Sequence, residues 1–127
     1  MEVDNTKGLL QFGKIYKSNS RVYEETHGGV TVYSFYYYLI MFNQDGLFTL
    51  VQVFNGKSIT DSVESFNQLD RLPSNFFQLD NRIITFEINE YGESRIFSGQ
   101  VLKDGIVGKY SDSGQFKSKE VFELLEK

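Results

Sequence analysis

Short turn signals recur along the chain and divide it into apolar runs. Asp45-Gly46, Asn55-Gly56 and Asp104-Gly105 are typical of tight hairpin turns, because Gly adopts positive φ freely and Asp or Asn tolerates it. Proline occurs once, at Pro73. This punctuation predicts about nine antiparallel strands joined by hairpins. The expected strands are Leu9–Lys17, Arg21–Thr26, Val30–Phe42, Leu47–Phe54, Asn75–Leu79, Arg82–Asn89, Ser94–Leu102, Ile106–Tyr110 and Phe116–Leu125.

One segment has a different period. Within residues 61–71, the apolar residues Val63, Phe66 and Leu69 recur at helical spacing. A short helix is therefore expected there, and Pro73 ends it. The apolar stripe of this helix is expected either to pack on the sheet or to cross one open end of a barrel.

The number of strands leaves two architectures, a closed up-and-down barrel and a two-sheet sandwich. Hairpins that connect neighbours throughout favour the barrel, and closure also removes exposed strand edges. The chain has 127 residues and no break in composition. We therefore expect residues 1–127 to form one all-β domain, an antiparallel meander that closes into a small barrel of about eight or nine strands with one short helix.

The hairpin around Asp45-Gly46 is apolar on both faces, which indicates that it is central or covered on both sides. Its register decides which face is the interior, because a shift of one residue reverses every side chain. A loop of two or four residues places the odd-numbered residues of Val30–Phe42 on the same face as the even-numbered residues of Leu47–Phe54. A loop of three residues places these two sets on opposite faces. We expect the inner set to be Tyr33, Phe35, Tyr37, Leu39, Met41, Phe48, Leu50, Gln52 and Phe54.

The second half alternates apolar and polar residues, as a sheet with one buried face does. The turns at Asp80-Asn81, Glu90–Glu93 and Asp104-Gly105 agree on one inner face. The inner set is expected to be Phe77, Leu79, Ile84, Phe86, Ile88, Phe97, Gly99, Val101, Ile106, Gly108 and Tyr110.

Two cross-strand pairs follow from these turns. Phe86 is expected opposite Phe97, and Tyr110 opposite Gly99, where an aromatic ring would cover a gap in the backbone. For the last hairpin, a loop of four residues sends Phe116, Phe122 and Leu124 outward, and a loop of five sends them inward. We prefer the loop of five, because it buries both Phe rings.

Composition excludes several classes of function. Cysteine is absent, so no disulfide, thiolate nucleophile or cysteine-ligated zinc site can form. The formal net charge of −4 argues against binding to phosphate backbones, so no nucleic-acid partner is expected. Residues 1–5 lack the features of a secretory signal, and Val30–Phe42 is too short to span a bilayer. We therefore expect a cytoplasmic protein without a membrane partner.

No residue pattern indicates a catalytic centre. His27 is the only histidine and precedes Gly28-Gly29 in an expected turn, which excludes a histidine-dependent triad and a histidine-rich metal site. Most carboxylates fall in turns, at helix starts or on outward strand positions, and Glu120 is expected on a solvated strand face beside Lys117 and Lys119. The glycines form no phosphate-binding loop. We expect no enzymatic activity, no cofactor and no metal.

Turns and aromatic residues follow a particular order in the second half. Residues 77–83 place a turn Asn before an apolar strand, Arg95–Val101 contains an aromatic-x-Gly strand, and Lys103–Gly108 begins with an Asp turn. In this order the segment resembles bacterial lipocalin-like domains of the calycin group, over roughly the last 50 residues. The resemblance implies a closed barrel with an internal ligand site. The Gly-x-Trp of lipocalins is missing, because the chain contains no Trp.

Arginine and tyrosine residues are the candidates for recognition. Arg82 and Arg95 are expected on the inner face, where an Arg near the mouth binds a ligand carboxylate through two hydrogen bonds. Alternatively, each side chain reaches solvent or pairs with a nearby Glu. Tyr36 and Tyr38 project to the face opposite Tyr37, and they either pack in the core or present a surface to a partner.

Two functions of different classes follow from these features. The first is a lipocalin-like barrel that binds a small apolar or amphipathic ligand in its interior, where burial contributes about 25 cal/mol per Å². The second is a small acidic protein-binding or inhibitory factor, of the immunity or anti-defence type, acting through a Tyr- and Glu-rich surface that contains Tyr36 and Tyr38. An enzyme ranks third. The expected ligand-binding residues are Phe35, Tyr37, Phe48, Leu50, Phe86, Arg95, Phe97 and Val101.

Overall fold

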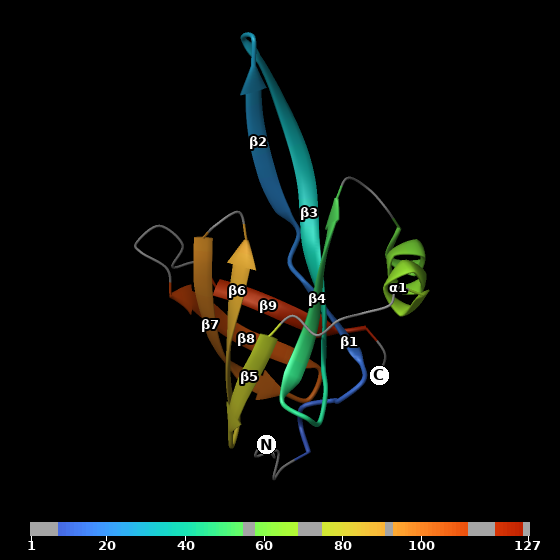
Figure 1. The fold of residues 1–127 in the computed structure, drawn as a ribbon, viewed down its shortest axis with the longest axis vertical. Helices are drawn as coiled ribbons and strands as arrows, with labels where there is room; N and C mark the ends of the chain where they lie inside the picture. The colour runs from blue at the N-terminus through green and yellow to red at the C-terminus, as the bar shows by residue number, and fades with distance from the viewer. Residues whose placement is uncertain (1–7, 55–57, 69–74, 91–92, 112–118, 126–127) are drawn as a thin grey trace.

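The computed structural model of the chain describes residues 8–54, 58–68, 75–90, 93–111 and 119–125 (Figure 1). Their regular elements are nine strands and one helix. In chain order the elements are β1 (Ile15–Ser18), β2 (Arg21–His27), β3 (Val30–Phe42), β4 (Leu47–Phe54), α1 (Ile59–Gln68), β5 (Asn75–Asp80), β6 (Ile83–Glu90), β7 (Glu93–Leu102), β8 (Gly105–Ser111) and β9 (Lys119–Leu124).

Eight of the strands form a closed antiparallel barrel. Strands β3 to β9 each pair with their neighbours in sequence, and β1 lies between β9 and β3. Tyr16 of β1 faces Ile40 of β3 on one side and Leu124 of β9 on the other, which closes the barrel. The predicted all-β meander that closes into a barrel is confirmed, and the two-sheet sandwich is excluded.

Strand β3 extends beyond the barrel wall. It has 13 residues, and β4 pairs with it only between Phe42 and Tyr36. The outer part of β3 pairs instead with β2, up to His27 opposite Val30. We call β2 together with residues 30–35 of β3 the arm. Figure 1 shows the arm as a two-stranded ribbon that projects beyond one end of the barrel.

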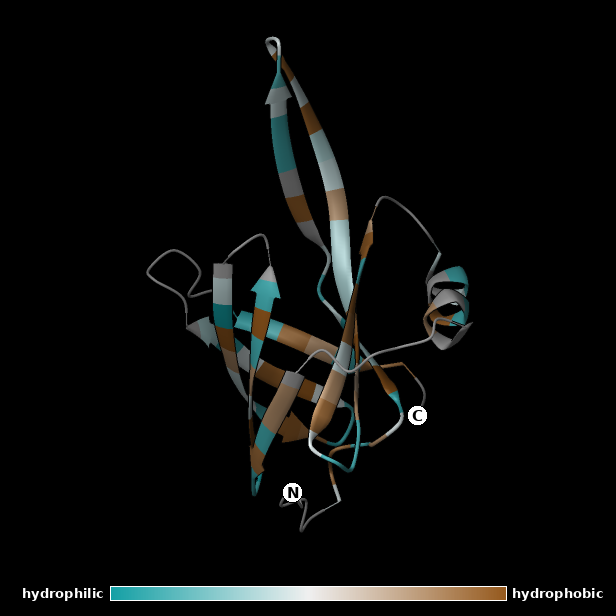
Figure 2. Cartoon of the chain, in the orientation of Figure 1, coloured by the Kyte–Doolittle hydropathy of each residue, from teal (hydrophilic) through white to brown (hydrophobic). Residues whose placement is uncertain are grey.

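The barrel interior holds a continuous cluster of aromatic rings. The Phe86 ring centroid lies 5.0 Å from that of Phe97 and 5.1 Å from that of Phe48. Along the strands, hydrophobic segments are interrupted by hydrophilic ones (Figure 2), because successive side chains point to opposite faces. The buried members of this interior cluster are Leu10, Tyr16, Tyr38, Ile40, Phe42, Phe48, Phe77, Leu79, Ile84, Phe86, Ile88, Phe97, Val101, Ile106, Tyr110, Phe122 and Leu124.

The register predicted for the first hairpin is wrong. Phe42 pairs with Phe48, so the loop between them comprises residues 43–47, an odd number. Within this loop the Leu47 amide donates a hydrogen bond to Asp45 Oδ1 at 3.1 Å. A loop with an odd number of residues places the even-numbered residues of β3 on the same face as Phe48 and Leu50 of β4. The even-numbered residues of β3, and not the predicted odd-numbered ones, therefore face the interior.

Helix α1 packs on the outside of the barrel wall. Phe66 of α1 is fully buried in a second cluster that contains Tyr37 of β3 and Val53 of β4. This hairpin is therefore covered on both faces, as predicted, although Tyr37 points outward and not into the barrel. The helix expected over residues 61–71 overlaps α1, and its expected end lies outside the described residues.

The inner face predicted for the second half is confirmed. Phe86 of β6 lies opposite Phe97 of β7, as expected. Phe97 in turn lies opposite Tyr110, so the prediction that Tyr110 faces Gly99 is wrong. The turn between β7 and β8 is formed by residues 103–104 and not by the predicted residues 104–105. The observed pairing is therefore shifted by two residues from the predicted one, and the same side chains still face inward.

Gly99 of β7 and Gly108 of β8 lie opposite each other beneath the Phe97 ring. A Cβ atom at Gly99 would lie 2.8 Å from Phe97 Cζ, and one at Gly108 would lie 2.7 Å from the same atom. An aromatic ring thus covers the glycine gap, but it belongs to Phe97 and not to Tyr110. Phe122 and Leu124 of β9 also face inward, as preferred, and Phe116 lies outside the described residues.

Ionisation of Tyr16 is expected to lower the stability of the barrel at high pH. Burial raises the pKa of its phenol above the usual 10.0, although a hydrogen bond from the Gln11 amide to Oη, at 3.0 Å, opposes the shift. The unfolded chain therefore ionises first, so the contribution of Tyr16 to stability is intact below pH 10 and is lost above it. We expect Tyr16→Phe to flatten the decline in unfolding free energy above about pH 10. Urea unfolding measures this decline, and an equal decline in both proteins would contradict the assignment.

Candidate functional site

The end of the barrel from which the arm projects is called the upper end (Figure 1). Because neighbouring strands of the meander are antiparallel, the barrel part of β3 begins at this end, as do β7 and β9, and β8 finishes there. Inward-facing residues near these strand ends therefore share the upper interior. These residues are Tyr38, Arg95, Tyr110 and Glu120.

Arg95 is the buried cation of the upper interior, with 9% of its surface exposed. Its alternation with Phe97 on β7 turns it inward, as predicted. Arg95 Nη2 donates a hydrogen bond to Tyr38 Oη at 2.9 Å, and its Cζ lies 5.1 Å from the centroid of the Tyr110 ring. Side chains from β3 and β8 thus fix the position of the guanidinium inside the barrel.

Tyr38 connects Arg95 to the barrel wall. Its backbone amide donates to Ser18 Oγ at 2.8 Å, and its ring is fully buried. The half-buried Tyr36 ring lies 5.8 Å from the Tyr38 ring and 5.9 Å from the Phe54 ring of β4, so three rings lead from the upper edge to Arg95. Tyr38 lies inside the barrel and is not part of the partner surface that the sequence predicted.

Glu120 is a buried carboxylate that the sequence interpretation missed. It lies opposite Gly108 and is 2% exposed. The signal was present in β9, where Glu120 alternates with the inward-facing Phe122 and Leu124. The upper interior therefore contains two ionisable side chains of opposite charge. Burial of charged groups costs free energy unless they are compensated. The two charged side chains therefore distinguish the upper interior from the apolar interior below it.

Most of the predicted ligand-binding residues face the interior, and two do not. Phe35 is 56% exposed on the arm, and Tyr37 lies in the outer cluster with α1. Both errors have one cause, the odd-numbered loop of residues 43–47. Arg82, also expected inside, is exposed in the turn between β5 and β6. The predicted residues that do belong to the interior are Phe48, Leu50, Phe86, Arg95, Phe97 and Val101.

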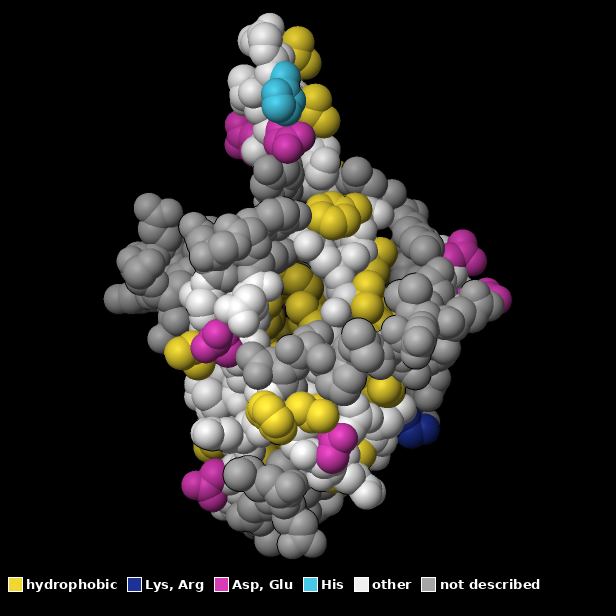
Figure 3. All heavy atoms as spheres, in the orientation of Figure 1, with side chains coloured by type: hydrophobic (Ala, Val, Ile, Leu, Met, Phe, Trp, Pro, Cys, Tyr) yellow, Lys and Arg dark blue, Asp and Glu magenta, His cyan; other side chains and the backbone are white. Residues whose placement is uncertain are grey.

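The described pairing between β4 and β5 is short. Among the described residues, β5 pairs with β4 only through Leu47 with Phe76 and Phe48 with Asn75. Above these pairs, the described part of the chain places no strand between β4 and β6. Figure 3 shows hydrophobic side chains set back in a hollow at this position.

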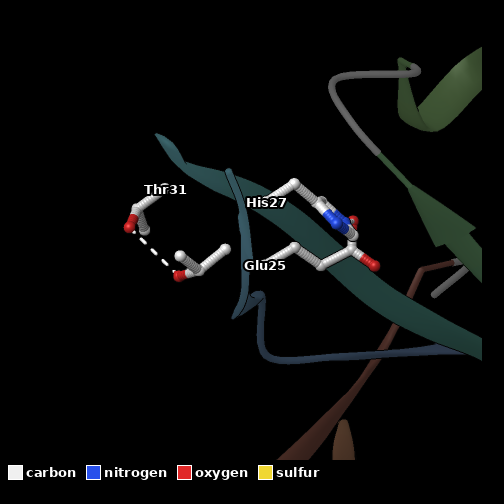
Figure 4. Close-up of polar contacts among 4 residues, drawn as sticks. Glu25, His27 and Thr31 are labelled. Carbon is white, nitrogen blue, oxygen red and sulfur yellow. Dashed lines mark hydrogen bonds and ion pairs between the residues drawn. The ribbon is translucent and has the colours of Figure 1, made fainter. Parts of the chain in front are cut away.

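The arm is a second candidate site, because its side chains are exposed to solvent. Thr26 and Thr31 hydroxyls lie 3.1 Å apart across the two strands, and His27 Nε2 lies 3.6 Å from Glu25 Oε2 (Figure 4). The arm also carries large apolar side chains that are more than half exposed, which is typical of a surface that binds a partner. These are Val22, Val30, Val32, Tyr33 and Phe35.

Comparisons with known proteins leave the chain without a matching family. No protein-family model matches it, and neither a curated protein nor a solved structure shows significant similarity. Within the described residues, no group of three or more His, Asp or Glu side chains is placed to hold a metal ion. No helix in the part of the chain that the structure describes has the length and apolar character needed to cross a bilayer.

Proposed function

We propose that this chain binds a small amphipathic molecule with an anionic group, a carboxylate or a phosphate, in the upper interior of the barrel. The proposal depends on one observation, the burial of Arg95 among aromatic rings with its guanidinium held by Tyr38 and Tyr110. Burial of a charged group rarely adds net stability. A role in ligand binding would account for a guanidinium at this place.

The guanidinium of Arg95 supplies the recognition of the anionic group. Its planar fork binds carboxylates and phosphates through two parallel hydrogen bonds. The surrounding rings exclude water, which strengthens these bonds. The packed rings below Arg95 limit how deep a ligand reaches, so its apolar part lies near the upper edge, against Leu50, Tyr36 and Phe54.

The architecture supports the same proposal. Antiparallel barrels of about eight strands either hold one small ligand, as lipocalins do, or are filled by their own side chains. In this barrel the lower interior is occupied by phenylalanine rings, and the upper interior contains polar and charged groups. The proposal is therefore of a lipocalin-like barrel with a small, anion-selective site.

Binding of a dansylated fatty acid, an anionic apolar fluorophore, tests the role of Arg95. We expect Arg95→Met to weaken binding roughly tenfold to a hundredfold, because a hydrogen bond to a charged group contributes about 1.5–3 kcal/mol. Arg95→Lys keeps the charge and is expected to restore part of the affinity. Fluorescence titration gives the dissociation constants, and native mass spectrometry of the unmodified chain shows any molecule that co-purifies.

Arg82→Met is the matched control, because it removes the same side chain from an exposed turn. It is expected to bind the probe as the unmodified chain does. Circular dichroism verifies that each variant is folded. The proposal is overturned if folded Arg95→Met and Arg82→Met bind equally well, or if a dansylated fatty amide without the charge binds as tightly as the acid.

A further inference from the structure

The face of β3 that lines the upper interior continues onto the arm. Successive side chains of a strand alternate between its two faces, and the even-numbered residues of β3 face the interior. Every residue of β3 has a partner directly opposite it on β2 or β4, so no bulge reverses the faces along the strand. The row that begins beside Arg95 therefore extends to the tip of the arm. Its residues are Tyr38, Tyr36, Ser34, Val32 and Val30.

The strands opposite this row are short near Arg95. β7 begins at Glu93, two residues before Arg95, and β8 ends at Ser111, one residue after Tyr110. At about 3.3 Å per residue, β7 continues about 7 Å beyond Arg95, which is the length of about six bonds in an extended chain. A ligand whose anionic group is bound by Arg95 therefore passes the end of β7 when its apolar chain is longer than this.

Beyond the end of β7, the row on β3 offers an exposed apolar surface. Val32 is 52% exposed and Val30 is 63% exposed. On β2, Glu25 lies opposite Val32 on the same face, and His27 lies opposite Val30. Figure 4 shows Glu25 and His27 on one side of the arm and Thr31 on the other. The apolar surface is therefore a narrow row on β3 with polar neighbours on β2, which has the dimensions of a single extended chain.

We propose that the arm binds the apolar chain of the ligand along Tyr36, Val32 and Val30, and that the site therefore selects long-chain anions. This inference rests on the proposed function, because Arg95 fixes the anionic end. Continuity of the row with the upper interior supports it, since the chain buries apolar surface without leaving the face on which it starts. The orientation follows from charge, because the carboxylate of Glu25 disfavours an anionic group on the arm.

Competition of octanoate and dodecanoate with the dansylated fatty acid tests this selection. The shorter acid ends near the beginning of β7, whereas the longer acid reaches the arm. We expect the unmodified chain to bind dodecanoate at least about tenfold more tightly, because each additional methylene group contributes about twofold when it is half buried. Fluorescence titration below the micellar concentration of each acid gives the two dissociation constants.

A shortened arm is the decisive variant. Deletion of residues 24–27 and 30–33 joins the Gly28-Gly29 turn to Tyr23 and Ser34, which already lie opposite each other. An even number of residues leaves each strand, so the alternation of faces and the hydrogen-bond pattern are kept. This variant is expected to bind octanoate as the unmodified chain does, and to lose about fivefold or more of the preference for dodecanoate.

A pair of single substitutions separates the two faces of the arm. Val32→Thr removes apolar surface from the row and keeps the branched Cβ that strands favour. It is expected to weaken dodecanoate binding about twofold to threefold and to leave octanoate binding unchanged. Val22→Thr is the matched control, because Val22 is 58% exposed on the opposite face, and it is expected to bind both acids as the unmodified chain does.

The outcomes distinguish this inference from the proposed function. If folded chains with the shortened arm keep the full preference for dodecanoate, or if Val22→Thr and Val32→Thr weaken binding equally, the role of the arm is overturned. Loss of binding in Arg95→Met still supports the proposed function in that case. If neither acid binds the folded unmodified chain, the proposed function is overturned and this inference with it. Circular dichroism verifies that each variant is folded.

Discussion

The Phe97→Ala variant is expected to lose about 3–5 kcal/mol of unfolding free energy. The Phe97 ring is fully buried, and its centroid lies 5.0 Å from Phe86, 5.4 Å from Tyr110 and 5.2 Å from Phe122. Its removal leaves a cavity at a point where four strands contribute rings, and those rings are fixed by their own packing. Guanidinium chloride unfolding, followed by circular dichroism, measures the loss.

Phe35→Ala is the control for this prediction, since it deletes the same side chain from the exposed arm. We expect a change within about 0.5 kcal/mol, because exposed substitutions rarely exceed that value. Equal losses for the two variants would show that Phe97 does not lie in the barrel interior.

The Gly108→Ala variant is expected to lose at least about 1–3 kcal/mol, the usual result of overpacking, and to accumulate as insoluble protein. Its Cβ would lie 2.5 Å from the Cα of Gly99 and 2.7 Å from Phe97 Cζ. The Gly99 contact involves backbone, so β7 and β8 must separate before a methyl group fits. Thermal unfolding and the soluble fraction after expression measure the effect.

Lys109→Ala tests whether any alanine on β8 has this effect, because residue 109 is the exposed neighbour on the outer face. It is expected to change the unfolding free energy by less than about 0.5 kcal/mol. If Gly108→Ala is as stable as Lys109→Ala, the close approach of β7 and β8 at this pair is wrong.

The inner face of the second half could be predicted because its alternation of apolar and polar residues is compatible with only one buried face. Phe86, Ile88, Phe97 and Val101 alternate with polar residues, so a one-residue slip would bury charges. In the first hairpin, a slip of one residue would bury no charge. Its two faces are both apolar and both covered, so only the loop length decides, and the loop of residues 43–47 was not recognisable from Asp45-Gly46 alone.

The candidate site was predictable to the same extent. Arg95 follows from alternation on β7, whereas Glu120 was assumed to be solvated, as most carboxylates are. The arm had a signal that was not used: Val30–Phe42 is longer than Leu47–Phe54, so part of it had to lie beyond the shared wall.

Strand β1 gives the barrel a particular order of assembly. Tyr16 pairs with Leu124 of β9, so the last contact of the wall joins residues from nearly opposite ends of the described chain. Such non-local pairings slow folding, because loop-closure entropy is lost before the contacts form. During synthesis, the meander from β3 to β8 can assemble while its lateral edges remain open. Closure waits until β9 has left the ribosome, and until then those edges can pair with other chains.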